Sequence, residues 1–112
     1  MADSAAWGEE AAEAPIDAHA RWAFAIASRV GDSDRERLAY LGLGLASEAG
    51  ELAHHLKRLI RDGVADPEGF SEELGDILYY WSALCQAAGR RPSDLIAESR
   101  AKIEARLVGA PS

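Results

Sequence analysis

The chain has 112 residues, of which 48% are hydrophobic and only 4 are proline, so we expect one small helical domain. Charged residues interrupt every apolar run before the roughly 20 residues of a membrane crossing, and the N-terminus lacks the apolar segment of a signal peptide. The net charge of -7 argues against nucleic-acid binding. The single cysteine, Cys85, fits a reducing compartment. We therefore predict a cytoplasmic protein without nucleic-acid or membrane partners.

The sequence divides into an arm, a domain and a tail. Residues 1–15 carry four acids and no base, which predicts a flexible acidic N-terminal arm. A single all-α domain is expected over residues 16–108, followed by a C-terminal tail over residues 109–112. The first helix should run from about Ile16 to Val30. Its apolar residues go most of the way round, so we expect burial on more than one side.

The second predicted helix has clear signals at both ends. Ser33 and Glu36 have the spacing of a capping box, in which each side chain bonds a free backbone N–H. Gly63 is a typical stop, so the helix should end at Arg61 or Asp62. This makes it the longest helix of the chain.

Two glycines interrupt the second helix. Gly42 and Gly44 each cost about 1 kcal/mol relative to alanine in a helix interior. We therefore expect them to admit a close neighbour, which is either another helix or a ligand.

Two shorter helices should follow a turn over residues 63–70. The third is predicted over residues 71–88, and the fourth opens at Pro92 with Ser93 as its N-cap and reaches about Leu107. Four helices joined by short loops predict an all-α, four-helix bundle-like fold.

Two pairs of carboxylates mark the second and third helices, namely Glu48 with Glu51 and Glu73 with Asp76. Residues three apart share a helix face, so each pair points in one direction. Glu48 also falls on the leucine stripe of its helix, where a carboxylate is costly unless it is paired or bound to metal. The second pair alone could simply stabilise the start of a helix. Together the four oxygen donors predict a hard cation, either Mg²⁺ or Mn²⁺.

A di-iron centre is a rival interpretation. Glu51 and His54 have the Glu-x-x-His spacing of di-iron bundles, but those bundles take this pair from two helices and need further glutamates. We expect His54 and His55 to be partly exposed and incidental, although His55 shares the carboxylate row and could sit near a metal or a phosphate.

The fourth helix and the aromatic residues suggest what accompanies the cation. Between Arg90 and Arg106 there are five bases against three acids. This positive segment could bind a metal-bound phosphate, or it could simply be the solvated face of a basic helix. Trp22 and Tyr80 are core-packing residues or a wall on which a nucleobase stacks.

The segments GLASEAGELAHHLKRL, EELGDILYYWSAL and SRAKIEARL resemble the MazG-like all-α nucleotide pyrophosphohydrolases, over about Trp22 to Leu107. That family carries E-x-x-E and then E-x-x-D on consecutive helices, followed by a lysine on the last helix. The resemblance implies a MazG-type fold assembled as a dimer or tetramer. It also implies hydrolysis of a nucleoside triphosphate at the α–β linkage to the monophosphate and pyrophosphate, with clearance of the nucleotide pool as its purpose.

The resemblance further implies site roles. The Mg²⁺ ligands would be Glu48, Glu51, Glu73 and Asp76. Lys102 would contact phosphate, and Ser99 stands where the family often has an asparagine. We predict Glu51 as general base and Lys102 as the second catalytic residue. The predicted substrate-binding residues are Trp22, Lys57, Tyr80, Ser99, Lys102 and Arg106.

Two alternatives stay open. The bundle could be a non-catalytic helical interaction module that keeps its acids for structural reasons. It could also be a phosphoribosyl-ATP pyrophosphohydrolase, a related helical enzyme with the same use of metal.

Overall fold

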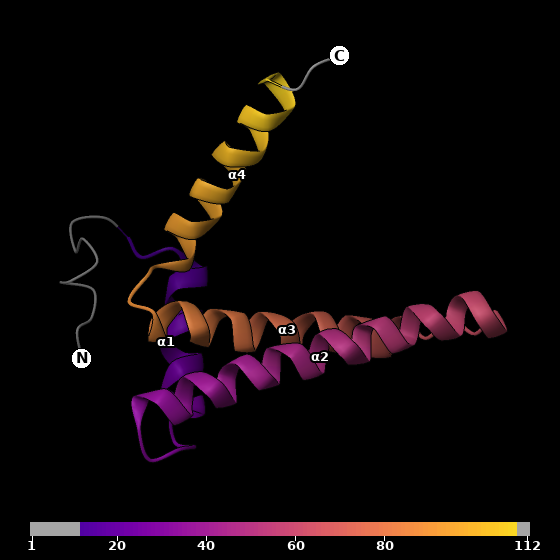
Figure 1. The fold of residues 1–112 in the computed structure, drawn as a ribbon, viewed down its shortest axis with the longest axis horizontal. Helices are drawn as coiled ribbons and strands as arrows, with labels where there is room; N and C mark the ends of the chain where they lie inside the picture. The colour runs from indigo at the N-terminus through magenta and orange to yellow at the C-terminus, as the bar shows by residue number, and fades with distance from the viewer. Residues whose placement is uncertain (1–11, 110–112) are drawn as a thin grey trace.

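The computed structural model describes residues 12–109, which form four α-helices and no strand (Figure 1). These are α1 (Pro15–Ala27), α2 (Asp34–Asp62), α3 (Pro67–Ala87) and α4 (Pro92–Gly109). The predicted all-α fold with four helices is confirmed. None of the described helices combines the length and the apolarity that a membrane crossing would need.

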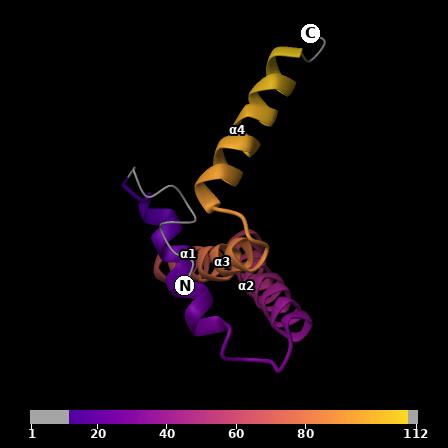
Figure 2. The same cartoon turned by 90° about the vertical axis from the view of Figure 1, so that its left-hand side faces the viewer.

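The long helix α2 and the helix α3 lie side by side as an antiparallel pair, and α1 crosses α3 near one end of that pair (Figures 1 and 2). Small residues make this crossing close, because α1 buries alanines against α3. The single chain therefore buries one face of α1, not several as expected, and Trp22 is 55% exposed. The buried hydrophobic residues are Ala20, Ala23, Ala27, Leu41, Ala83 and Cys85.

Both ends of α2 follow the sequence signals. The Ser33 hydroxyl accepts a hydrogen bond from the backbone N–H of Glu36 at 3.1 Å, and the Glu36 carboxylate accepts one from the N–H of Asp32. At the other end, Gly63 adopts the left-handed conformation with φ 67°. The capping box and the glycine stop are thus confirmed, with the reciprocal bond shifted by one residue to Asp32.

The start of α3 differs from the prediction. The helix begins at Pro67, four residues before the expected start, because Asp66 caps it by accepting a hydrogen bond from the N–H of Gly69 at 3.0 Å. Proline in the first turn loses no hydrogen bond and its fixed φ suits a helix. Glu73 therefore lies beyond the first turn, so simple stabilisation of the helix start explains it less well.

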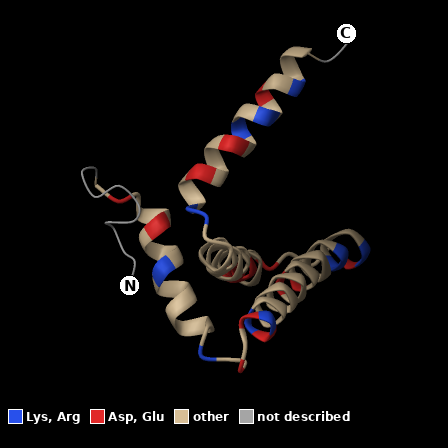
Figure 3. Ribbon diagram, turned by 60° about the vertical axis from the view of Figure 1, so that its left-hand side comes forward, with Lys and Arg blue, Asp and Glu red and all other residues tan. Residues whose placement is uncertain are grey.

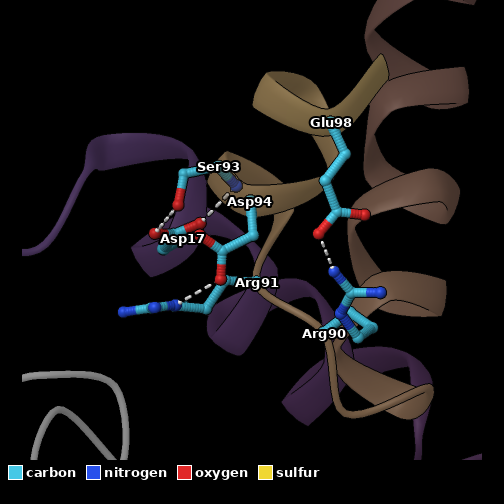
Figure 4. A network of polar contacts seen from close by, with 6 residues as sticks. All are labelled: Asp17, Arg90, Arg91, Ser93, Asp94 and Glu98. Carbon is cyan, nitrogen blue, oxygen red and sulfur yellow. Dashed lines mark hydrogen bonds and ion pairs between the residues drawn. The ribbon is translucent and has the colours of Figure 1, made fainter. Parts of the chain in front are cut away.

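Helix α4 is joined to the rest through its first turn. The buried carboxylate of Asp17 in α1 accepts hydrogen bonds from the backbone N–H of Ser93 at 2.9 Å and from its hydroxyl at 2.6 Å (Figure 4). The predicted N-cap role of Ser93 is wrong, since Ser93 lies inside the helix and donates to a cap that a distant segment supplies. Near this joint, Arg91 pairs with Asp94 and Arg90 with Glu98.

The second half of α4 stands clear of the other helices (Figures 1 and 2). The radius of gyration of the Cα atoms is 17.0 Å, against roughly 13 Å for a compact domain of this length. Many large apolar side chains are correspondingly exposed, and Leu41 is the one buried residue of α2. The most exposed of these side chains are Leu43, Ile60, Leu107 and Val108.

Two predicted segments, the N-terminal arm and the C-terminal tail, fall partly outside the described residues. Of the arm predicted over residues 1–15, the described end carries Glu13, which pairs with Arg21, and Pro15, which opens α1. Of the predicted tail, Gly109 is the last residue of α4.

Candidate metal centre

Gly44 on α2 lies directly against the Tyr80 ring on α3. A Cβ on Gly44 would lie 2.6 Å from Tyr80 Cδ1 and closer still to the next ring atom, which no real Cβ tolerates. The absence of a side chain at Gly44 thus lets the Tyr80 ring lie against α2. The close neighbour predicted at Gly44 is thus confirmed, and it is another helix. The close neighbour predicted at Gly42 is absent from the described part of the chain, because a Cβ there would meet nothing within 4 Å.

One turn further along, the same register brings three carboxylates together. One oxygen each of Glu48 on α2 and of Glu73 and Asp76 on α3 all lie within 4.8 Å of one another. Glu48 and Glu73 are half-buried and Asp76 is exposed. Converging carboxylate oxygens at an accessible position are the ligand set that Mg²⁺ and Mn²⁺ prefer. The residues present therefore fit a hard divalent cation.

The electrostatics of this cluster show that like charges crowd together. The pKa of Glu48 is raised, first because its side chain shares a hydrogen bond with Glu73 and then because burial disfavours the charge. The neighbouring charges of Asp76, Glu73 and Glu51 raise that pKa further. A bound cation would offset this crowding of negative charge.

Glu51 lies at the edge of this cluster. It is exposed and falls outside the group of three converging oxygens, although its charge acts on Glu48. His54, its partner in the di-iron interpretation, is exposed as well and is not part of the group. A role for Glu51 as ligand or base stays a prediction.

His55 lies beside the acids, as its place on the carboxylate row allowed, although we expected it to be incidental. Its Nε2 lies 3.6 Å from Glu73 Oε2 and its Nδ1 lies 3.9 Å from Asp66 Oδ2, with 15% of the side chain exposed. The Nδ1 atom is buried and has no hydrogen-bond partner, which costs about 1–3 kcal/mol. His55 follows Glu48 by two helical turns on the same face, and this spacing could have placed it in the site.

Aromatic rings form a wall beside the acids. Trp22 on α1 meets Tyr79 edge to face at 5.8 Å between centroids, and Tyr79 meets Tyr80 in the same way at 5.1 Å. Tyr80 in turn contacts Tyr40 on α2. Burial, followed by a hydrogen bond with Tyr40, raises the pKa of Tyr80 to about 12, and the charge of Glu48 adds to the shift. The wall therefore runs from the exposed indole of Trp22 to the edge of the acid cluster.

Residues 37–107, more than half of the chain, match the family described as the MazG nucleotide pyrophosphohydrolase domain. The chain belongs to this family. The match contains all four predicted acids and the predicted phosphate-binding residues of α4, whereas Trp22 precedes it.

The chain is also similar to a phage protein. The Gene 37 protein of Mycobacterium phage L5 is 41% identical over 66 residues, which cover 54% of this chain and 58% of that protein. The chain thus spans little more than half the length of this relative. No solved structure matched the chain.

The single MazG domain does not bring its predicted phosphate-binding residues to the acids. Ser99 and Lys102 line a hollow of about 780 Å³ between α4 and Trp81, and Arg106 is exposed on the half of α4 that diverges from α2 and α3 (Figure 1). Lys57 follows Glu48 by nine residues on α2, which turns it by about 180° to the opposite face. None of these residues belongs to the group of converging acids.

Charges of both signs are spread along α4 (Figure 3). Arg100 pairs with Glu104, and the hollow beside Trp81 is lined by acids as well as bases. The helix thus presents separate bases within a mixed surface, which suits a small anionic ligand better than a polyanion.

Proposed function

We propose that this chain catalyses the Mg²⁺-dependent hydrolysis of a nucleoside triphosphate, or a related nucleotide, at the α–β linkage. The products would be a nucleoside monophosphate and pyrophosphate. The observation that carries this proposal is the convergence of Glu48, Glu73 and Asp76 within the segment that matches the MazG family. Mn²⁺ is the second cation that these oxygens would accept.

The acids have separate roles in this proposal. Glu48, Glu73 and Asp76 would hold the cation, with Glu51 at its edge. A bound Mg²⁺ would neutralise the phosphate oxygens and polarise the linkage that breaks. We assign proton acceptance from the attacking water to Glu51, because this exposed carboxylate lies one turn from Glu48 and is not needed to close the group of three.

The remaining predicted residues would hold the nucleotide. Lys102 would stabilise charge that develops on the phosphates, with Ser99 and Arg106 on the same face of α4 and Lys57 as a further base. Trp22 and Tyr80 would supply the aromatic surface for the nucleobase. Their support is the continuous ring contact through Tyr79.

We propose that the active form is a homo-oligomer, a dimer or a tetramer, in which α4 of one subunit serves the acids of another. Support comes from the divergence of α4 from its own acids and from the exposed apolar residues on α2 and α4. Charge complementarity adds to this support, because the segment from Arg90 to Arg106 is net positive while the chain carries -7.

The test is a panel of canonical, modified and deoxy nucleotides, together with phosphoribosyl-ATP, incubated with the full chain and Mg²⁺ and assayed for pyrophosphate. We expect release from at least one nucleotide and its loss in Glu48→Gln and Asp76→Asn. No release from any member of the panel, or full activity in both variants, would refute the proposal. Preferential cleavage of phosphoribosyl-ATP would instead assign the related biosynthetic reaction.

A non-catalytic interaction module is the competing function, and the exposed apolar residues on α2 and α4 are what favours it. The two functions differ in their response to metal. In a catalytic centre, Mg²⁺ or Mn²⁺ should raise the melting temperature, and this rise should depend on the Glu73 carboxylate. In a module with incidental acids, no metal-induced rise should depend on Glu73.

A further inference from the structure

We propose that His55 is a positioning residue, whose imidazole Nε2 donates a hydrogen bond to Glu73 and so orients that carboxylate toward the cation. This inference rests on the proposed function. It adds a residue that the acid signature does not contain.

Proximity is the first argument. Glu73 Oε2 lies 3.6 Å from His55 Nε2, and both side chains are 15% exposed. That separation is just beyond hydrogen-bond length, so a small rotation of the Glu73 side chain closes it. Glu73 at present shares a hydrogen bond with Glu48. Glu73 thus contacts Glu48 on one side and has the His55 ring as a second neighbour that can hold its carboxylate in place.

The space for the ring is the second argument. A Cβ on Gly69 would lie 2.6 Å from His55 Cε1, so the start of α3 leaves a gap that the imidazole fills. Asp66 bounds the ring on another side. Its Oδ1 caps α3 by accepting from the N–H of Gly69, while its Oδ2 lies 3.9 Å from His55 Nδ1. The first turn of α3 thus limits the rotation of the ring.

These contacts link the position of α3 to the geometry of the acid cluster. Metal-binding carboxylates are generally held by hydrogen bonds from neighbouring groups, and loss of such a partner weakens metal affinity about 10–100-fold. His55 comes from the helix that carries Glu48 and touches the helix that carries Glu73. It is therefore placed to keep ligands from two helices in register.

The experiment uses Mn²⁺ as its probe, titrated calorimetrically into the full chain. Removal of the ring in His55→Ala should weaken Mn²⁺ binding about 10-fold. His55→Gln should restore most of the affinity, because its amide nitrogen can reach the position of Nε2. His54→Ala, which changes the exposed neighbouring histidine, is the matched control and should bind as the wild type does.

A kinetic readout separates positioning from a general loss of structure. In His55→Ala the Mn²⁺ concentration for half-maximal rate should rise by the same factor, while kcat at saturating Mn²⁺ stays within about twofold. Wild-type Mn²⁺ affinity in His55→Ala would overturn the inference. The inference would also be overturned if His55→Ala and His55→Gln lost the same Mn²⁺ affinity and had equally lowered melting temperatures in chelator.

A second variant keeps the test decisive if His55→Ala does not fold. Gly69→Ala places a methyl group against the ring and should also weaken Mn²⁺ binding, and unchanged affinity would count against the role of His55. The proposed function fails separately, if His55 governs Mn²⁺ affinity but no nucleotide is cleaved. Absence of any Mn²⁺ binding to the wild type would overturn both.

Discussion

The ring of Tyr80 lies where a side chain on Gly44 would project, so this close contact between α2 and α3 depends on a missing Cβ. This contact is one turn from Glu48 and sets the helix register in which the carboxylates meet.

Substitution of that glycine should therefore destabilise the protein. Gly44→Ala gains up to about 1 kcal/mol of helix propensity, but forcing a methyl group against the ring costs about 1–3 kcal/mol. We expect a net loss that lowers the melting temperature by several degrees, measured by circular dichroism. Gly42→Ala is the matched control, because a Cβ there meets nothing within 4 Å, and it should be neutral or stabilising. Equal melting temperatures for the two variants would contradict this account of the register.

Metal should stabilise the chain through the acid cluster. At 100 times its dissociation constant, a cation that binds only the folded state adds about 2.7 kcal/mol to the free energy of unfolding. We expect Mg²⁺ and Mn²⁺ to raise the melting temperature of the wild type, and Asp76→Asn to lose most of this gain. Glu72→Gln removes an exposed acid beside the cluster and should respond as the wild type does. A full metal response in Asp76→Asn would show that the cation binds elsewhere.

The pH dependence of the metal-free protein should report the crowding around Glu48. Because its pKa is raised in the folded chain, the folded state holds a proton that the unfolded state releases. The stabilisation linked to this proton is complete below the ordinary carboxyl pKa and is lost as the pH rises through the raised value. We expect Glu48→Gln to be more stable than the wild type at neutral pH in chelator, and this difference should shrink on acidification. If the stability advantage of Glu48→Gln over the wild type grew on acidification, the raised pKa of Glu48 would be contradicted.

The joint between α1 and α4 should be sensitive to loss of its buried acceptor. Asp17→Ala leaves the N–H and the hydroxyl of Ser93 without their partner, at a cost of about 1–3 kcal/mol. We expect a lower melting temperature and faster proteolysis within α4. Ser99→Ala, an exposed change on the same helix, should leave both unchanged. Wild-type proteolysis of Asp17→Ala would mean that other contacts hold α4.

A mixing experiment tests whether subunits share sites. If Lys102 acts on the acids of another subunit, Asp76→Asn and Lys102→Ala should each be inactive alone yet recover activity together. Random mixing into dimers gives up to about a quarter of the wild-type rate, because half of the dimers contain one intact site out of two. Mixed samples that stay inactive, despite exchange of subunits seen by native mass spectrometry, would place Lys102 with its own acids.

Most of the fold follows from local signals, since capping residues and stop glycines act within a few residues of themselves. Ser33, Glu36 and Gly63 fixed α2 to within a residue. The start of α3 was predicted too late because Asp66 and Pro67 were interpreted as turn residues, although the same pair caps a helix. The cap of α4 could not be found locally, because Asp17 lies 76 residues from Ser93.

Which residues belong to the candidate site was largely predictable from helical periodicity. The three-residue spacing put Glu73 and Asp76 on one face of α3, and the leucine stripe placed Glu48 toward the neighbouring helix. How closely these acids and His55 approach one another depends on the register between the helices, and the close contacts at Gly44 and Gly69 that accompany this register are not identified by any periodicity. The position of α4 relative to the acids was not predictable, because its joint depends on the long-range contact between Asp17 and Ser93.

Helix α4 has 18 residues and is held at its first turn, and most of the stability of a helix in a protein comes from tertiary packing. In the proposed oligomer its far turns, with Leu107 and Val108 exposed, would owe that packing to a neighbouring subunit. Dilution below the dissociation constant of the assembly would unwind those turns first, and with them the bases that face the phosphates. Catalysis would therefore switch off with falling protein concentration, before the acid cluster between α2 and α3 lost its shape.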